Sequence, residues 1–286
     1  MDYHSKYNDR SRSLLILVLV LFVSCEDVIQ VDTPSEEPRL IIDAIIGVDV
    51  SENVTPLAVK ASLTSPFFGT TPLTNLKQIT LSNLDGISVI LKEFTPGSGV
   101  YEEFVGPSYL AGGEIIFQVE HEDQRYLART NFVPIPPIDT LIQVSQPGSE
   151  NGVEVAAAFN DVGGRRDYYL FDMGNGELFT INDTFFDGER HQFIYRYERE
   201  ILAGDSLEVL VYGIDQQFHN YINQLISQSQ DSPSPFDTPV ATLIGNIINV
   251  TKIDNLDSFD NVQSPENFIL GYFAIAETHR KSIVIQ

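Results

Sequence analysis

The sequence predicts a mainly β protein: an N-terminal immunoglobulin-like β-sandwich, followed by a second antiparallel β-domain that carries one amphipathic helix. Short apolar segments alternate with polar residues at a period of two, and turn residues separate them roughly every 8–12 positions, as in β-sandwiches. One later segment, near residues 215–229, instead repeats at the helical period. Hydrophobic residues make up 43% of the 286 positions, enough to bury a sizeable core.

The first 24 residues have the pattern of a secretory signal peptide. Leu14–Val23 is an unbroken apolar run of ten residues. A membrane-spanning helix needs about 20 such residues, so the run fits the hydrophobic region of a cleaved leader instead. The basic residues ahead of it are Lys6, Arg10 and Arg12. Ser24 and Cys25 follow the run directly, and Cys25 is the only cysteine, which excludes an internal disulfide.

The segment Phe22-Val23-Ser24-Cys25 resembles the lipobox of bacterial lipoproteins. In that family the cysteine sulfur receives a diacylglyceryl group and the leader is cut before the cysteine. Two acyl chains anchor stably, because each buried methylene contributes about 0.8 kcal/mol. We therefore expect lipidation at Cys25, an acidic tether over residues 25–37, and a membrane as partner through this anchor. An ordinary cleaved signal with an incidental cysteine is the alternative.

Glu26 and Asp27 follow the cysteine immediately. In Bacteroidetes lipoproteins acidic residues at this place resemble a surface-export signal, so we expect an outer-membrane protein exposed on the cell surface. The alternative is that two acids simply begin a solvated tether. Removing the leader, which holds three basic and two acidic residues, changes the net charge from −23 to −24. This charge argues against nucleic acid as a partner, since phosphate binding depends on Lys and Arg.

Residues 38–133 are predicted to form the β-sandwich. Asn83–Gly86 is a turn that ends in a glycine, where φ can be positive, and Gly97–Tyr101 is a turn that leads into another strand. The other strands expected here are 39–46, 57–63, 78–81, 87–94, 114–120 and 125–132. Three prolines then fall within residues 134–137. Proline cannot continue a central strand or a helix, so we expect a linker and domain boundary there.

Residues 138–286 are predicted to form the second β-domain. Its expected strands are 141–144, 153–159, 167–172, 177–181, 191–200, 207–212, 244–250 and 268–276. The helix within it has one apolar face, formed by Phe218, Tyr221, Ile222, Leu225 and Ile226. Asp215 can cap its start, and the proline-containing segment 231–235 ends it. We expect the apolar face to pack on the sheet; a partner-binding helix is the alternative.

The search for chemistry predicts no catalytic, cofactor-binding or metal-binding residues and no cofactor. His121 and Glu122 begin a zinc-protease motif, but Arg125 stands where the second histidine belongs. Gly174–Gly176 lacks the third glycine of a dinucleotide-binding loop, and the chain has neither a Walker loop nor a GxSxG elbow. We therefore expect a non-enzymatic protein. A hydrolase built from scattered carboxylates is the alternative.

Two further segments have a functional and a structural interpretation. Residues 254–261 contain aspartates and asparagines that could bind calcium, but their spacing matches no EF-hand loop, and a solvated acidic loop is preferred. Phe193, Tyr195 and Tyr197 share one face of a predicted strand. They could stack on a sugar or peptide, but a half-buried sheet face explains them more simply.

Eight short segments stand in a characteristic order: Cys25–Val28, Leu40–Gly47, Leu63–Phe68, Gly99–Tyr101, Pro136–Asp139, Pro235–Pro239, Gly245–Ile247 and Leu270–Phe273. Together they resemble a family of Bacteroidetes outer-membrane lipoproteins catalogued as domain of unknown function forty-two forty-nine. The first domain is also similar to the carboxypeptidase-regulatory type of β-sandwich. Members of the family often accompany TonB-dependent transporters, so the resemblance implies such a transporter as partner. It implies no catalytic residue.

These expectations combine into one leading hypothesis and one alternative. The leading hypothesis is an outer-membrane, surface-exposed lipoprotein that serves as a non-enzymatic binding or accessory subunit of a TonB-dependent nutrient uptake complex. The alternative is a structural or adhesive surface lipoprotein with no role in uptake.

Overall fold

A computed structural model describes residues 37–65, 70–145, 152–229, 242–251 and 269–286. Over these residues the fold is mainly β, as the period-two alternation predicts, with two sheets and one helix of seven or more residues. Pro38 begins a compact unit that continues to Gln286. Cys25 and the acidic loop 254–261 lie outside the described residues. The expected domain boundary at 134–137 stays a prediction.

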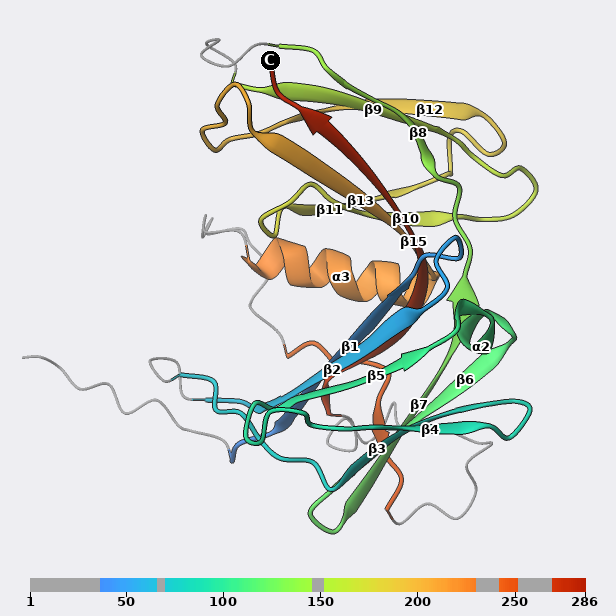
Figure 1. The fold of residues 1–286 in the computed structure, drawn as a ribbon, viewed down its shortest axis with the longest axis vertical. Coiled ribbons are helices and arrows are strands. Elements are labelled where there is room, and N and C mark those ends of the chain that lie inside the picture. Colours follow the sequence, from blue (N-terminus) through green and yellow to red (C-terminus); the bar gives the residue numbers. More distant parts are fainter. Residues whose placement is uncertain (1–36, 66–69, 146–151, 230–241, 252–268) are drawn as a thin grey trace, which may run out of the picture. The chain divides into compact units, whose positions relative to one another are not determined.

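The larger sheet has 12 strands drawn from both halves of the chain (Figure 1). Its strands are β1 (Leu40–Val48), β2 (Thr55–Leu63), β3 (Gln78–Asn83), β4 (Ser88–Leu91), β5 (Val100–Val105), β6 (Glu114–His121), β7 (Gln124–Val133), β10 (Tyr168–Asp172), β11 (Leu178–Asn182), β13 (Ser206–Ile214), β14 (Ile248–Asn249) and β15 (Leu270–Val284). Its main path runs β11-β10-β13-β15-β7-β6-β3-β4, and β1 joins β15 to β2 and β5.

The smaller sheet has three strands in the order β12-β9-β8. They are β8 (Ile138–Gln143), β9 (Glu154–Asn160) and β12 (Arg190–Arg196). Two helices complete the described fold: α2 (Pro107–Ala111) and α3 (Gln216–Ser229). The sequence does not predict α2, because a segment of five residues is too short to show a helical period.

β15 is the strand that connects the two halves. Its first part pairs in parallel with β1, with Ile42 opposite Gly271, and its last part pairs antiparallel with β13. The predicted strand ended at Ala276, but the observed strand continues to Val284. The polar segment from Glu277 to Lys281 hides this continuation in the sequence. Backbone pairing to β13 keeps the segment extended, so tertiary context overrides the local pattern.

The side chain of Asn246, within the predicted strand 244–250, forms hydrogen bonds with the backbone of β15. Its Oδ1 accepts a hydrogen bond from the backbone N–H of Phe273 at 2.9 Å, and its Nδ2 donates to the carbonyl of Phe273 at 2.8 Å. The amide therefore pairs with β15 as a strand residue would. Regular strand geometry covers only Ile248–Asn249 and not the whole predicted range 244–250.

Two large clusters of buried apolar residues form most of the described core. The first lies among β1 to β7 and also takes Phe273 and Ile275 from β15. The second lies among β8 to β13 and includes Ile285, just after β15. The alternation in β1 shows why: Leu40, Ile42, Ala44, Ile46 and Val48 are all buried. A period of two therefore places one face of the strand in the core.

α3 packs on the sheet through the face that its periodicity predicts. Phe218 and Ile222 are buried in a third cluster, where they meet Leu170 of β10 and Tyr272 of β15. The carboxylate of Asp215 accepts a hydrogen bond from the backbone N–H of Phe218 at 2.7 Å, which is the geometry of an N-cap. The expected cap is observed, and so is the expected packing face except at Leu225, which is 43% exposed.

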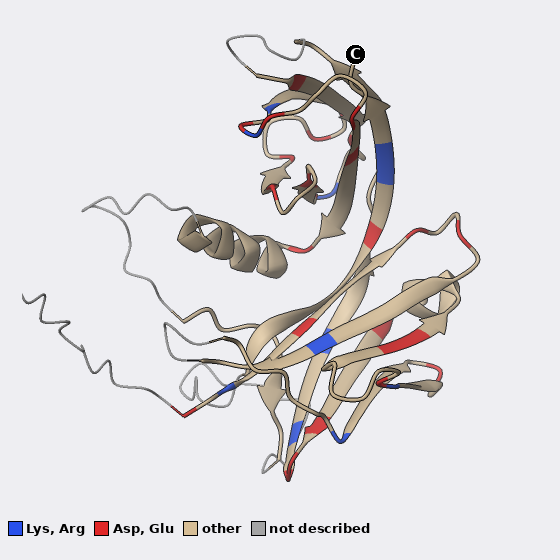
Figure 2. Cartoon of the chain, turned by 60° about the vertical axis from the view of Figure 1, so that its left-hand side comes forward, with Lys and Arg blue, Asp and Glu red and all other residues tan. Residues whose placement is uncertain are grey.

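Charged residues are spread over the described chain (Figure 2). Acidic side chains occur on strands and turns of both halves, as expected for a chain with 40 Asp and Glu against 17 Lys and Arg. This distribution gives the protein a general negative potential that attracts cations and repels anions.

Candidate functional site

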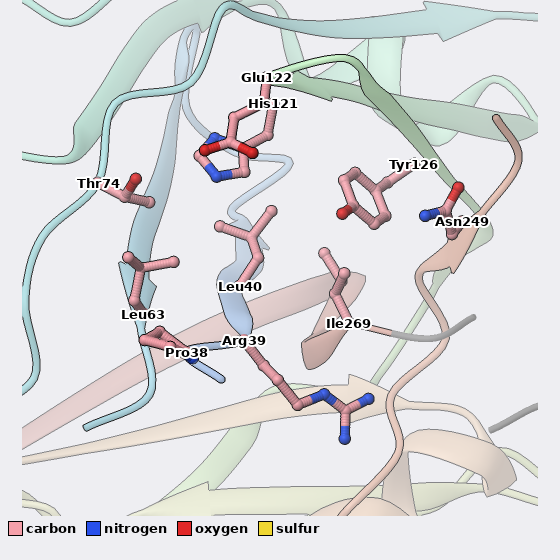
Figure 3. Close-up of a pocket in the computed structure, with 10 residues that line it drawn as sticks. All are labelled: Pro38, Arg39, Leu40, Leu63, Thr74, His121, Glu122, Tyr126, Asn249 and Ile269. Atoms are coloured by element: carbon pink, nitrogen blue, oxygen red, sulfur yellow. The ribbon is translucent and has the colours of Figure 1, made fainter. Parts of the chain in front are cut away.

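A pocket of about 420 Å³ opens between the start of β1 and the β6–β7 hairpin (Figure 3). Small-molecule sites have volumes of about 300–1,000 Å³, so the pocket is large enough for a small ligand. Its lining residues come from six separate parts of the chain: Pro38, Arg39, Leu40, Leu63, Thr74, His121, Glu122, Tyr126, Asn249 and Ile269.

The β1 side of the pocket is fixed by backbone pairing. Leu40 lies opposite Leu63 in the antiparallel β1–β2 ladder. One residue earlier, the N–H of Arg39 donates to Oγ1 of Thr64 at 2.9 Å, and its carbonyl accepts from the N–H of Thr64 at 2.9 Å. These bonds extend the ladder past the end of the regular strand and hold Leu40 and Leu63 as an apolar wall.

The opposite side of the pocket is formed where β14 pairs with β7. Asn249 lies opposite Tyr126 in this ladder. The Nδ2 of Asn249 donates to Oε1 of Gln124 at 2.8 Å, and its Oδ1 accepts from the N–H of Thr251 at 3.0 Å. Since its amide is already used, Asn249 acts as a wall of the pocket, and Tyr126 supplies the polar group on this side.

His121, the last residue of β6, and Glu122, in the turn of the β6–β7 hairpin, lie at one end of the pocket. The Nδ1 of His121 lies 3.2 Å from the carbonyl oxygen of Asn75. A carbonyl only accepts, so in the neutral ring the proton is on Nδ1, and Nε2 is an acceptor. Glu122 has a φ of 52°, a left-handed conformation that costs a non-glycine residue energy.

Tyr126 keeps its phenolic proton. The side chain is nearly buried, and burial raises the pKa of its hydroxyl above the ordinary value of 10.0, with the negative charge of Glu122 adding to the effect. The hydroxyl has no hydrogen-bond partner among the residues that the structure describes. It is therefore available to a ligand as a donor or an acceptor.

Sequence reasoning does not predict this pocket. His121 and Glu122 were singled out only to reject a zinc-protease motif, and the structure gives them a place in a cavity instead. The lining residues have no common spacing in the sequence, because five strands and their flanking segments bring them together. Only the unusual acid in a tight hairpin turn could have indicated the site.

The aromatic stripe on β12 belongs to the core. Tyr197, one residue beyond the strand, is 1% exposed, and Phe193 and Tyr195 pack against the same buried cluster. The hydroxyl of Tyr195 donates to Oε2 of Glu177 at 2.7 Å, and the Phe193 ring meets Phe171 edge-on at 4.9 Å. The structure therefore favours the simpler interpretation, a half-buried sheet face.

Three aspartates come together at the end of the smaller sheet, although no motif predicts them. Asp161 and Asp183 are buried and Asp187 is exposed, and one ligand oxygen from each lies within 4.8 Å of the others. Three such carboxylates are the donor set of a hard cation such as calcium. They are the one candidate for a metal site among the described residues.

Hydrogen bonds already occupy most of this cluster. The N–H of Gly188 donates to Asp161 at 2.7 Å, and the N–H of Gly164 donates to Asp187 at 2.8 Å. Asp183 accepts from the backbone at 3.0 Å through its Oδ2, and a guanidinium lies 3.1 Å from its Oδ1. The cluster therefore fastens the loop after β9 to the loop after β11 and has a structural explanation.

No helix within the described ranges is long and apolar enough to cross a membrane. The model of the family described as "Domain of unknown function (DUF4249)" matches residues 26–282. A search of curated proteins found no match.

Two solved structures are similar to this chain at low sequence identity. A protein of the DUF4785 family from Legionella pneumophila shares 13% identity, with 60% of this chain and 52% of that chain covered and a TM-score of 0.22. The chain thus spans about half of that protein. The ligand-binding domain of human OSCAR shares 10% identity, with 64% of this chain and 93% of that chain covered and a TM-score of 0.19.

Proposed function

This chain belongs to the DUF4249 family, and from that premise we propose that it is an outer-membrane lipoprotein, lipid-anchored through Cys25 and exposed on the cell surface. In this proposal it serves as a non-enzymatic binding or accessory subunit of a TonB-dependent nutrient uptake complex. The observation that carries the proposal is the lone cysteine that follows a ten-residue apolar run, with one serine between them.

The pocket supports a binding role. A cavity that combines an apolar wall with a few converging polar groups is the usual form of a small-molecule site. Here Leu40 and Leu63 supply the wall, and His121, Glu122 and Tyr126 supply the polar groups. The strained backbone of Glu122 adds support, because strained residues concentrate at ligand-binding positions.

The acidic tether supports a role next to a membrane protein. The thirteen-residue tether Cys25–Glu37, which begins with the expected anchor, leads to Pro38, the first residue of the pocket lining. Fully extended, such a segment spans at most about 45 Å. The tether therefore keeps the start of the pocket lining within about 45 Å of the membrane anchor, and so near any transporter in the same membrane.

Co-purification tests this function. The native lipoprotein is crosslinked in cells, extracted from outer membranes with mild detergent, and captured through an epitope added after Gln286. Mass spectrometry should find a TonB-dependent transporter enriched over a capture of the Cys25→Ala variant. Efficient capture without any transporter would contradict the proposal. Deletion of the gene that alters surface attachment but leaves nutrient uptake unchanged would favour the structural or adhesive alternative.

A further inference from the structure

We infer that the pocket binds a small organic cation: a primary ammonium group joined to a branched apolar body. The inference rests on the proposed binding function and names the ligand class. It follows from three features of the pocket: which polar atoms face it, where its one basic side chain points, and which apolar residues line it.

The polar end of the pocket is rich in acceptors. Glu122 contributes a carboxylate, which can only accept, and His121 contributes its Nε2, which is an acceptor when the ring is neutral. The Tyr126 hydroxyl lies close enough to Glu122 for the carboxylate charge to raise its pKa. An ammonium group offers three donors and a positive charge, so it satisfies these acceptors together.

The basic residue of the pocket does not offset this end. Figure 3 shows the Arg39 side chain extending away from His121 and Glu122, on the far side of Leu40. The charge that faces a ligand at the polar end is therefore that of Glu122, and the net charge of −23 attracts cations over longer distances.

The apolar side chains of the pocket indicate that the rest of the ligand is apolar. Leu40, Leu63 and Ile269 line the pocket beside its polar end. They can cover a branched alkyl group, but they offer nothing to a second charge. A carboxylate on the ligand would meet the repulsion of Glu122 and lose its hydration without a partner. The pocket thus selects an amine over an acid of the same shape.

Glu122 keeps its place against the local preference of the backbone. Its φ of 52° belongs to a region where glycine is favoured, yet a glutamate occupies the turn. The turn holds the carboxylate at the pocket at the cost of backbone strain. This observation also supplies a useful variant, because Glu122→Gly removes the carboxylate and relieves the strain at once.

Three probes of one shape test the ligand class. Isopentylamine, isopentanol and isovalerate differ in charge but share the same apolar body. Calorimetric titration of the lipoprotein in nanodiscs should give tighter binding in the order amine, alcohol, acid, with the amine favoured on the order of tenfold over the alcohol. Added salt should lower the binding affinity of the amine but not that of the alcohol or the acid. Equal binding of the three probes, tighter binding of the acid, or no binding would overturn the inference.

Two variants and one control test the residue. Glu122→Gln and Glu122→Gly should each remove the preference for the amine while leaving the affinity for the alcohol unchanged. Asp85→Asn, a change of another exposed acid in a hairpin turn, should alter neither. Glu122→Gly should be at least as stable as the parent protein, so its loss of preference would not reflect unfolding. A preserved preference in both Glu122 variants would refute the assignment.

The source of the amine can be separated as well. The peptide Leu-Gly-Gly carries the same ammonium and branched body at its N-terminus, and its binding alongside isopentylamine would identify peptides as ligands. Binding of isopentylamine alone would identify free amines. Failure of this inference is distinguishable from failure of the proposed function, because transporter capture does not depend on which probe enters the pocket.

Discussion

The hydroxyl of Tyr169 donates a hydrogen bond to the carboxylate of Asp161. Tyr169 lies on β10 of the larger sheet, and Asp161 follows directly after β9 of the smaller sheet. The other carboxylate oxygen of Asp161 accepts from the N–H of Gly188 at 2.7 Å. One buried carboxylate therefore joins the two sheets and a loop. Burial and this hydrogen bond raise the pKa of Tyr169 far above its ordinary value, so the proton stays in place.

Replacing Tyr169 by phenylalanine should lower the free energy of unfolding by about 1–3 kcal/mol, because a buried carboxylate oxygen loses its donor. Urea denaturation followed by tyrosine fluorescence measures the change. The matched control is Tyr168→Phe. Tyr168 is the neighbouring residue, is only partly buried, and has no hydroxyl hydrogen bond within the described chain. Equal effects of the two changes would show that the bond to Asp161 contributes little.

The substitution Gly271→Ala should destabilise the protein by about 3–5 kcal/mol. Gly271 has a φ of 93°, and a Cβ there would overlap the carbonyl group of Ile42 on β1. Gly86→Ala separates the two causes. Gly86 also has a positive φ, 77°, but nothing lies within 4 Å of its Cβ position, so only strain of about 1–2 kcal/mol remains. Thermal unfolding should rank the two variants in this order.

Removing the cap of α3 should cost about 1 kcal/mol. In Asp215→Ala the N–H of Phe218 loses its acceptor at the start of the helix. Asp215→Asn should restore most of the stability, since asparagine is as good a cap. Guanidinium denaturation monitored by far-UV circular dichroism measures both. A loss in the asparagine variant as large as in the alanine variant would indicate that charge, and not capping, sets the contribution.

Acidification should destabilise the protein in part through His191. The ring is half-buried and stacks on Phe186 at 4.0 Å, and burial lowers its pKa below the ordinary value of 6.5. The unfolded chain therefore binds the proton at a higher pH than the folded chain. The stability that the neutral ring contributes is present above pH 6.5 and is lost as the pH falls toward the folded-state pKa.

The variant His191→Phe keeps the aromatic stacking and removes the titration. Its free energy of unfolding should fall less than that of the parent protein between about pH 7.5 and pH 5.5. A part of the dependence should remain, because burial also lowers the pKa of His219. Identical pH dependence in variant and parent would contradict the role of His191.

The change Cys25→Ala should release the protein from membranes or stop its maturation, because no thiol remains to carry acyl chains. Fractionation of cells followed by immunoblotting measures the distribution. Ser24→Ala is a suitable control, since it alters a neighbouring small residue and should leave attachment intact. Unaltered membrane attachment of the Cys25 variant would contradict the lipid anchor.

The fold class and α3 could be predicted because their signals are local. The alternation in Leu40–Val48 and the spacing of Phe218 and Ile222 reflect which side chains face the core. Both patterns can be recognised within a short stretch of sequence. The full length of β15 cannot be predicted from its local sequence. Its polar second half is extended because of β13, a strand that is distant in sequence.

The pocket and the aspartate cluster were missed for a related reason. Glu122 by itself is an exposed acid in a turn, and only the pairing of β14 with β7 and of β1 with β2 surrounds it with Tyr126 and Leu40. Asp161 and Asp183 likewise meet only when their loops are fastened together. Sites assembled from several segments leave no fixed spacing in the sequence.

The pairing of β1 with β15 has a consequence for how the chain is made. The first strand of the sheet finds its parallel partner only in the last strand, so contacts between residues far apart in sequence must close before the core is complete. Such topologies fold slowly. A polypeptide that emerges from the ribosome therefore cannot pair β1 with β15, or complete the core that this pair supports, until nearly all of it has been synthesised.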